Sequence, residues 1–256
     1  MFNKHPQGLI AASFANMGER FGFYTMMAIL VLFLQAKFGL DGKGAGIIYS
    51  TFYFSIYILA LVGGIIADRT RNYKGTILAG IALMAIGYLI LAVPSPTPVS
   101  SKAFFLTITC VALFVIAFGN GLFKGNLQAL IGQMYDDPQY AKMRDSGFSL
   151  FYMFINIGAI FAPFAAVLVR NWWLSTFGLS YNADLPALCH GQLNGTLTPE
   201  AMHTFTDLAS KASSAPVTDL TVFAKEYLNV FTTGFHYAFG VAIGAMLISL
   251  VIFIVN

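Results

Sequence analysis

Long apolar runs alternate with short polar breaks along this chain of 256 residues. A helix that crosses about 30 Å of hydrocarbon needs about 20 mostly apolar residues. Six runs are long enough, and we expect a membrane-spanning helix in each: 9–36, 45–67, 75–93, 103–132, 146–169 and 235–255. The breaks carry charges, glycines and prolines, as in the cluster of Pro94, Pro96 and Pro98. The pattern therefore predicts an all-α polytopic membrane protein.

The composition supports this prediction. The chain is 57% hydrophobic and 10% charged, whereas soluble domains have roughly 45–50% apolar and about 25% charged residues. The net charge is only +3, and no basic block suggests a nucleic-acid partner. Cys110 lies in an apolar run and Cys189 in a polar stretch. We infer no disulfide framework or metal site from them and expect no cofactor.

The positive charges predict the orientation of the spans, because short cytoplasmic loops are enriched in Lys and Arg. With the N-terminus inside, the inner side collects Lys4, Arg69, Arg71, Lys74, Lys142 and Arg144. The outer short loops collect only Lys37, Lys43 and Lys102. We therefore expect a multi-pass protein of the cell membrane with a cytoplasmic N-terminus.

Three regions follow from this orientation. Residues 1–169 hold the first five spans, and residues 235–256 hold the sixth. Residues 170–234 then lie outside the cytoplasm, and they are polar and rich in Ser, Thr and Ala. This segment is long for a connector, so we expect a functional insertion or a mobile loop there.

Three charged residues fall inside the predicted spans, where a charge is costly and suggests a functional site. Glu19 and Arg20 lie about ten residues into the first span, and Lys124 lies about ten residues before the inner end of the fourth. At ~1.5 Å per helical residue, all three are roughly 15 Å deep. Tyr57 and Asn156 fall at compatible heights. The set suits a water-filled cavity that binds a charged or zwitterionic solute.

A structural alternative is that these groups satisfy one another between helices. The fourth span also contains GNGLFKG, in which Gly121 and Gly125 form a small-xxx-small pair. We expect both glycines to let a neighbouring helix approach closely and so to place Lys124 beside a partner helix.

Five motifs in order carry a family resemblance. GERFGFYTMMAILVLFL in the first span resembles the ExxERFxYY motif of the proton-dependent oligopeptide transporter family of the major facilitator superfamily. GGIIADR resembles the loop signature that follows the second span in the superfamily, and GLFKGNLQALIG resembles the family's FKPN segment. RDSGFSLFYMFINIGAIFAP and FHYAFGVAIGAML resemble its fifth and sixth spans. The resemblance covers almost the whole chain except residues 170–234.

The resemblance implies roles for individual residues. Glu19 and Arg20 would serve proton coupling and exchange a salt bridge with Lys124. The peptide site would be lined by Arg20, Tyr24, Tyr57, Lys124, Tyr152 and Asn156. Asp68 and Arg69, at the inner rim, would form a charge pair that gates the cytoplasmic side.

The resemblance also implies a function. We expect a secondary active transporter that imports di- and tripeptides by proton-coupled symport and alternating access, with the proton as coupling ion. Such transporters have two six-helix halves with the site between them. Six spans amount to the N-terminal half, so the C-terminal six-helix half is an expected partner, together with small peptides and the lipid bilayer.

Several departures from the family pattern keep alternatives open. Asn16, Phe23 and Met27 stand where the resemblance leads us to expect Glu, Tyr and Arg, and Gly125 replaces Pro. Asn16 cannot titrate, so it cannot carry a coupled proton. The three departures in the first span leave another small solute, such as nitrate or a drug, as an alternative substrate. A non-transporting receptor or scaffold that binds through 170–234 is another alternative. An enzyme is not expected, since neither HExxH nor GxSxG occurs.

Overall fold

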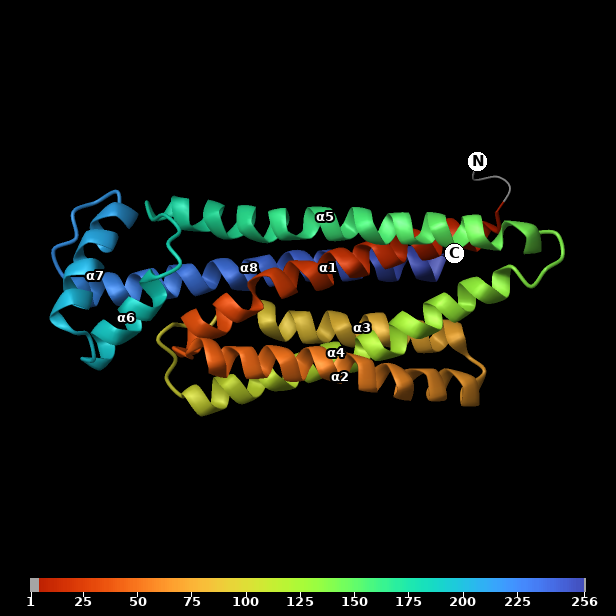
Figure 1. The fold of residues 1–256 in the computed structure, drawn as a ribbon, viewed down its shortest axis with the longest axis horizontal. Helices are drawn as coiled ribbons and strands as arrows, with labels where there is room; N and C mark the ends of the chain where they lie inside the picture. The colour runs from red at the N-terminus through yellow and green to blue at the C-terminus, as the bar shows by residue number, and fades with distance from the viewer. Residues whose placement is uncertain (1–4, 256) are drawn as a thin grey trace.

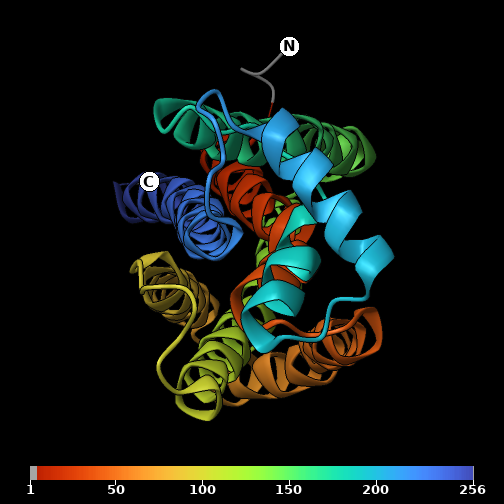
Figure 2. The ribbon, with the colours of Figure 1, turned by 90° about the vertical axis from the view of Figure 1, so that its left-hand side faces the viewer.

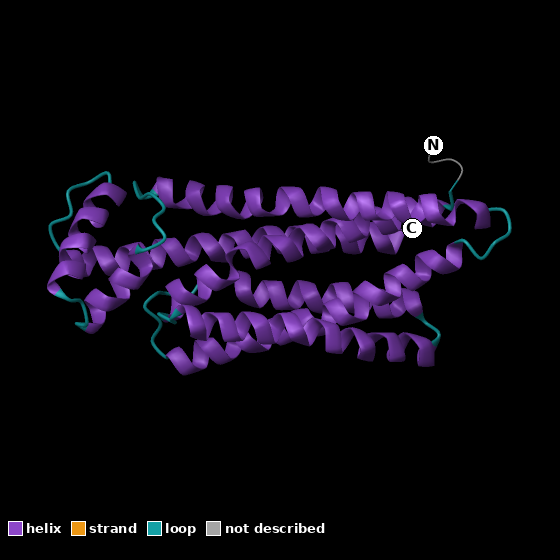
Figure 3. Ribbon diagram, viewed as in Figure 1, coloured by secondary structure: helices purple, strands orange, loops and turns teal. Residues whose placement is uncertain are grey.

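The structure is a computed structural model that describes residues 5–255. Its helices are α1 (Gln7–Phe38), α2 (Gly42–Thr70), α3 (Tyr73–Ala92), α4 (Lys102–Met134), the 3₁₀-helix η2 (Ala141–Met143), α5 (Arg144–Thr176), α6 (Leu185–Asn194), α7 (Pro199–Ala212) and α8 (Leu220–Val255). Figure 3 shows helices joined by loops and no strand in the described part. Lys4, which counted toward the predicted orientation, and Asn256 lie outside the described residues.

The predicted number of spans is confirmed. Within residues 5–255, six helices are long and apolar enough to cross a membrane, namely α1, α2, α3, α4, α5 and α8. They run side by side along the long axis of the molecule (Figure 1). The chain is therefore a multi-pass membrane protein.

Residues in the polar breaks start and stop these helices. The helix α1 ends at Gly39, whose left-handed backbone (φ 58°) suits a residue without Cβ. Its N–H donates to the carbonyl of Gln35 at 2.8 Å. Asp41 then caps α2 by accepting from the N–H of Gly44 at 2.8 Å. The short break between the first two spans thus contains both helix signals.

The six long helices form two groups of three. Helices α1, α5 and α8 pack together, and α4 packs between α2 and α3. The groups meet where α3 lies against α8 and where α1 approaches α2 and α4. Figure 2 shows α5 and α2 at opposite edges of the bundle, with α1 between them.

Glycines allow the closest helix crossings of α4. A Cβ atom on Gly121 would lie 2.5 Å from the carbonyl oxygen of Leu59 in α2. A Cβ atom on Gly119 would lie 2.6 Å from the carbonyl oxygen of Gly80 in α3. The prediction of close packing is confirmed for Gly121 and wrong for Gly125, around which nothing lies within 4 Å. Gly125 lies on the exposed face of α4, so no helix approaches it.

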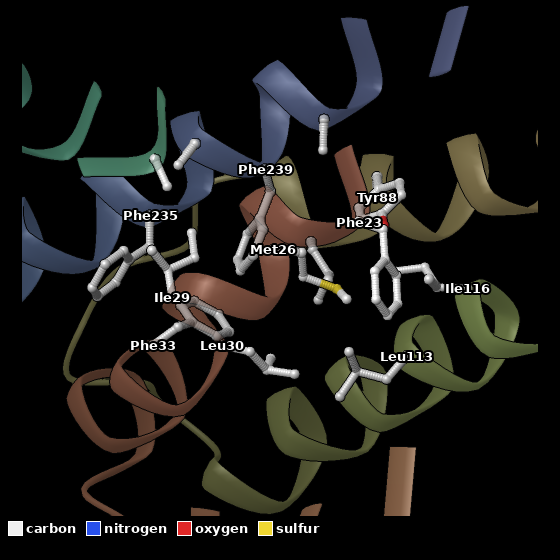
Figure 4. Packing of buried hydrophobic residues seen from close by; sticks show 14 of the residues in the cluster. Phe23, Met26, Ile29, Leu30, Phe33, Tyr88, Leu113, Ile116, Phe235 and Phe239 are labelled. Atoms are coloured by element: carbon white, nitrogen blue, oxygen red, sulfur yellow. The ribbon is translucent and has the colours of Figure 1, made fainter. Parts of the chain in front are cut away.

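Aromatic and aliphatic side chains fill the centre of the bundle. Figure 4 shows Phe33 of α1 facing Phe235 and Phe239 of α8. The ring of Phe33 lies edge-on to that of Phe239 at 5.1 Å, a favourable geometry for aromatic pairs. Met26 and Ile116 extend this core toward α4. The packing joins the two helix groups around α1.

Residues 170–234 do not form one irregular connection. Helix α5 continues to Thr176, and α8, the helix that carries the sixth predicted span, begins at Leu220. The extension of α8 carries Phe223, Tyr227 and Phe231 at helical spacing, and all three are buried. Polar residues such as Lys225 and Glu226 stand between them, so no continuous apolar run marks this part of the helix.

Helices α6 and α7 form a compact pair at one end of the bundle, which we call the α6–α7 end (Figures 1 and 2). Helix α6 packs on α8, and Leu185, Cys189 and Phe205 are fully buried. Burial raises the pKa of the Cys189 thiol to about 12. His190 of α6 lies 2.8 Å from the carbonyl of Ala36, near the end of α1. The pair is therefore attached to the spans by packing and by hydrogen bonding.

Candidate functional site

Glu19 and Arg20 form a buried ion pair within α1. Adjacent helical residues do not normally face each other, but the long Arg20 side chain reaches back to the carboxylate. Its Nη2 donates to Glu19 Oε1 at 2.7 Å, and its Nε donates to Glu19 Oε2. Glu19 is fully buried and Arg20 almost so. A two-point contact of this kind is among the stronger hydrogen-bonded ion pairs.

Asn120 of α4 completes this pair, although the sequence analysis did not select it. Its Nδ2 donates to Glu19 Oε1 at 2.7 Å, and the residue is fully buried. Asn120 precedes Lys124 by one helical turn, so a search of the same helix face could have found it. The contact links α1 to α4 through the one carboxylate of the site.

Two polar atoms beside the pair are left without a partner. Among the residues that the structure describes, the Tyr88 hydroxyl of α3 and Asn120 Oδ1 are buried and make no hydrogen bond. Tyr88 lies within electrostatic range of both Glu19 and Arg20. Buried polar atoms are usually satisfied, so unpartnered ones at a charged site point to a second arrangement in which they bond.

Lys124 does not contact Glu19 in this structure. Its Nζ lies 5.0 Å from the ring centre of Tyr57 in α2, a cation–π distance. No carboxylate of residues 5–255 lies within 4.0 Å of it. The expected cluster of two cations and one anion is therefore reduced to one pair here. The reason is that Arg20 and Asn120 already occupy Glu19, whereas Lys124 lies one turn further along α4, on Tyr57.

The other expected substrate residues are exposed. Tyr24 of α1, Tyr57 of α2, and Tyr152 and Asn156 of α5 all reach the surface. Their helices include α2 and α5, which form opposite edges of the bundle in Figure 2. Within the described chain, no hydrogen bond joins any two of the four; Tyr57 bonds to the hydroxyl of Tyr53 at 3.1 Å. That they line one site stays a prediction.

The expected gating pair is also placed differently. Asp68 and Arg69 are both exposed at the end of α2. Asp68 accepts a hydrogen bond from the hydroxyl of Tyr73, the first residue of α3. In the described part of the chain no ion pair joins Asp68 to Arg69. Adjacent side chains on a helix diverge by about 100°, so Asp68 bonds to α3 instead. Gating by these residues stays a prediction.

Sequence comparison decides the family. A sequence model described as the POT family matches residues 74–256. The chain belongs to the POT family. A Yersinia enterocolitica relative, described as peptide transporter YePEPT, is 36% identical over 182 residues, which are 69% of this chain and 33% of the relative. A di-/tripeptide transporter of Lactococcus lactis is 35% identical over 171 residues, covering 63% of this chain and 32% of the relative.

Structure comparison agrees with this membership. A crystal structure described as peptide transporter POT in complex with sulfate superposes with a TM-score of 0.66 at 26% identity, over 98% of this chain and 38% of that one. The chain thus spans about a third of the length of the POT relatives that it matches. The predicted fold class, the six-helix N-terminal bundle of a major facilitator superfamily transporter, is confirmed.

The departures from the expected POT motif can now be located. Phe23 is buried, and its ring centre lies 5.0 Å from the guanidinium carbon of Arg20. The ring face that a Tyr would present is thus retained, without the hydroxyl. Asn16 is buried in α1, and Met27 packs against the core. Glu19 and Arg20 keep the charges of the motif, whereas the uncharged Asn16 and Met27 stand where the resemblance led us to expect a Glu and an Arg.

Proposed function

We propose that this chain is the N-terminal half of a secondary active transporter that moves di- and tripeptides with protons by alternating access. The observation that carries the proposal is the contrast between a buried Glu19–Arg20 pair and Lys124, a cation with no acid partner among residues 5–255. POT membership and relatives described as peptide transporters support it. Transport, rather than enzymatic catalysis, is the activity of these relatives.

In this proposal the proton binds to Glu19. A neutral Glu19 no longer holds Arg20 by charge, so the guanidinium becomes available to a peptide carboxylate. If the Asn120 amide turns over, its Oδ1 can accept a hydrogen bond from the new O–H of Glu19. This oxygen has no partner among the described residues. The coupling ion would be the proton itself, and no other cofactor takes part.

Lys124 would be the second cation of the peptide site. A zwitterionic peptide needs cations for its carboxylate and an acceptor for its ammonium group. Arg20 and Lys124 would serve the carboxylate, and the exposed Tyr24, Tyr57, Tyr152 and Asn156 would line the remaining surface. A C-terminal six-helix half would supply the opposite wall and the acid for the ammonium group.

A second candidate is transport of another small solute. It is favoured by Asn16, which cannot take up a proton, and by Met27, which cannot form a salt bridge. Both candidates place the protein in the cell membrane with its N-terminus in the cytoplasm. They differ in whether peptides compete for uptake.

The experiment uses the full-length transporter reconstituted in liposomes. Under an imposed proton gradient we expect uptake of a labelled dialanine peptide. Lys124→Ala is expected to reduce this uptake to background, whereas Lys43→Ala, at the start of α2, should leave it unchanged. Uptake by the Lys124 variant at the unmodified rate would contradict the coupling role. Uptake of nitrate or a drug without competition by peptides would favour the second candidate.

A further inference from the structure

A second buried cation lies far from the Glu19–Arg20 pair, at the α6–α7 end. Lys37, near the end of α1, is only 1% exposed. Its Nζ donates to Thr97 Oγ1 at 2.8 Å and to the carbonyl oxygens of Ser95 and Pro96. No carboxylate of the described residues lies within 4.0 Å. Neutral oxygens satisfy its hydrogens but leave its charge uncompensated, which is unfavourable in a buried position.

His236 of α8 is the second polar group of this region. Its Nδ1 lies 2.5 Å from the carbonyl oxygen of Leu91. A carbonyl oxygen only accepts, so Nδ1 carries the hydrogen, and Nε2 of the neutral ring is a bare acceptor. His236 is 4% exposed, and within the described chain its Nε2 has no partner. The site therefore combines an uncompensated ammonium with an unused imidazole nitrogen.

Lys37 and His236 line the same cavity of about 310 Å³. Its other walls are mostly apolar side chains of α1, α3 and α4, including Phe33, Ile90 and Ile108. Small-molecule pockets are typically about 300–1,000 Å³, so this one suits a small or narrow ligand. Val93, also in the lining, is 59% exposed on the apolar surface that a membrane protein turns to lipid. The cavity thus holds the polar groups of Lys37 and His236 among mostly apolar walls, and its exposed rim at Val93 is apolar.

We propose that this cavity binds the acid group of a single-chain lipid amphiphile, a fatty acid. One carboxyl oxygen would accept from the Lys37 ammonium in place of the carbonyl oxygen of Pro96, which is the longest of its three contacts at 3.4 Å, and the other would share one proton with His236 Nε2. The hydrocarbon tail would follow Ile90 and Ile108 toward the bilayer. A phospholipid brings two chains and a substituted headgroup, which this volume does not favour.

The protonation state of His236 Nε2 sets the number of protons that fatty-acid binding takes up. A bare Nε2 repels a carboxylate, so binding of the ionised acid takes up one proton from solvent. That proton then lies between Nε2 and the carboxyl oxygen. Lys37 from α1 and His236 from α8 are the titratable groups of the lining, and the residues contributed by α3 and α4 carry none.

The test uses the full-length transporter in nanodiscs of phosphatidylcholine. A fatty acid with a photoreactive group on its tail is cross-linked, and the labelled peptides are mapped by mass spectrometry. We expect label on residues 90–93, at the end of α3, and on residues 105–109 of α4. Palmitate should compete for this labelling, whereas methyl palmitate and acetate should not. Label confined to other peptides would overturn the proposal.

Two variants test the polar groups separately. His236→Phe keeps a ring but removes the acceptor, and Lys37→Met removes the charge. Each loses a hydrogen bond to an ionised partner, so we expect labelling to weaken by at least about tenfold. Lys43→Met, an exposed matched control, should not change it. If Lys37→Met fails to fold, the proposal is tested with His236→Phe alone. Palmitate should then raise the melting temperature of the unmodified protein more than that of the His236→Phe variant.

Three results would contradict the assignment. Equal competition by methyl palmitate would mean that the acid group is not recognised. Equal competition by acetate would indicate a site for small anions without a role for the tail. Unchanged labelling of the His236→Phe variant would remove the imidazole from the site. None of these results depends on peptide uptake, so they are separable from the proposed transport function.

Discussion

Two charged sites in the membrane spans differ in how they are satisfied. The Glu19–Arg20 pair is buried, and Asn120 of a second helix bonds to its carboxylate. Lys124 is half-buried and contacts the ring of Tyr57, without an acid within 4.0 Å in the described chain. The first site is closed within this bundle, and the second offers its charge to groups outside it.

The difference separates stability from ligand recognition. Removing one partner of a buried ion pair leaves an uncompensated charge, whereas removing a partly exposed cation leaves none. We therefore expect substitutions at the two sites to affect folding very differently, even though the proposed mechanism needs both. The following three changes test this expectation.

The largest effect is expected for Arg20→Leu, which leaves Glu19 buried and unpaired. The free energy of unfolding should fall by about 3–5 kcal/mol, measured by equilibrium denaturation of the full-length protein in detergent. Arg69→Leu, an exposed control, should change it by less than about 0.5 kcal/mol. Adding Glu19→Gln to Arg20→Leu should recover more than half of the loss. Equal effects of Arg20→Leu and Arg69→Leu would contradict the closed pair.

Asn120→Leu should have an intermediate effect. It removes one hydrogen bond to an ionised carboxylate, with a typical contribution of about 1.5–3 kcal/mol. The same denaturation experiment measures the loss. A double-mutant cycle with Glu19→Gln then tests the coupling, because the effect of Asn120→Leu should shrink once the charge is gone. Strict additivity of the two substitutions would show that Asn120 stabilises the fold by another contact.

The smallest effect on folding is expected for Lys124→Gln. A cation–π contact at a partly exposed position contributes about 0.5–1 kcal/mol. Tyr57→Leu should lower the free energy of unfolding by the same amount, and combining it with Lys124→Gln should cause no further loss. A loss above 2 kcal/mol would mean that Lys124 has a buried acid partner. Such a result would mean that Lys124, like Arg20, is needed to compensate a buried charge, and the two sites would then not differ in their effect on folding.

The ends of some helices follow from the sequence, and the ends of others do not. The predicted break between spans 9–36 and 45–67 contains Gly39 and Asp41, and the structure places the end of α1 and the start of α2 at these residues. The start of α8 did not follow from the sequence, because Phe223, Tyr227 and Phe231 are buried by tertiary contacts. Phe223 packs against Phe205 of α7, and Phe231 stacks on Tyr181. Apolar length predicts a helix with a continuous apolar run, and it misses a helix segment whose apolar stripe is interrupted by polar residues and covered by protein.

The sequence by itself determined the six spans and the family. Apolar length and motif order depend on neighbouring positions in one chain, and the bilayer restricts what such runs can form. Only the tertiary structure decided which partner each charge takes. Glu19 could have met Arg20 or Lys124 at the same depth, and Asn120 and the packing of α4 selected Arg20. That choice depends on rotation and distance between helices, which span length and motif order do not specify.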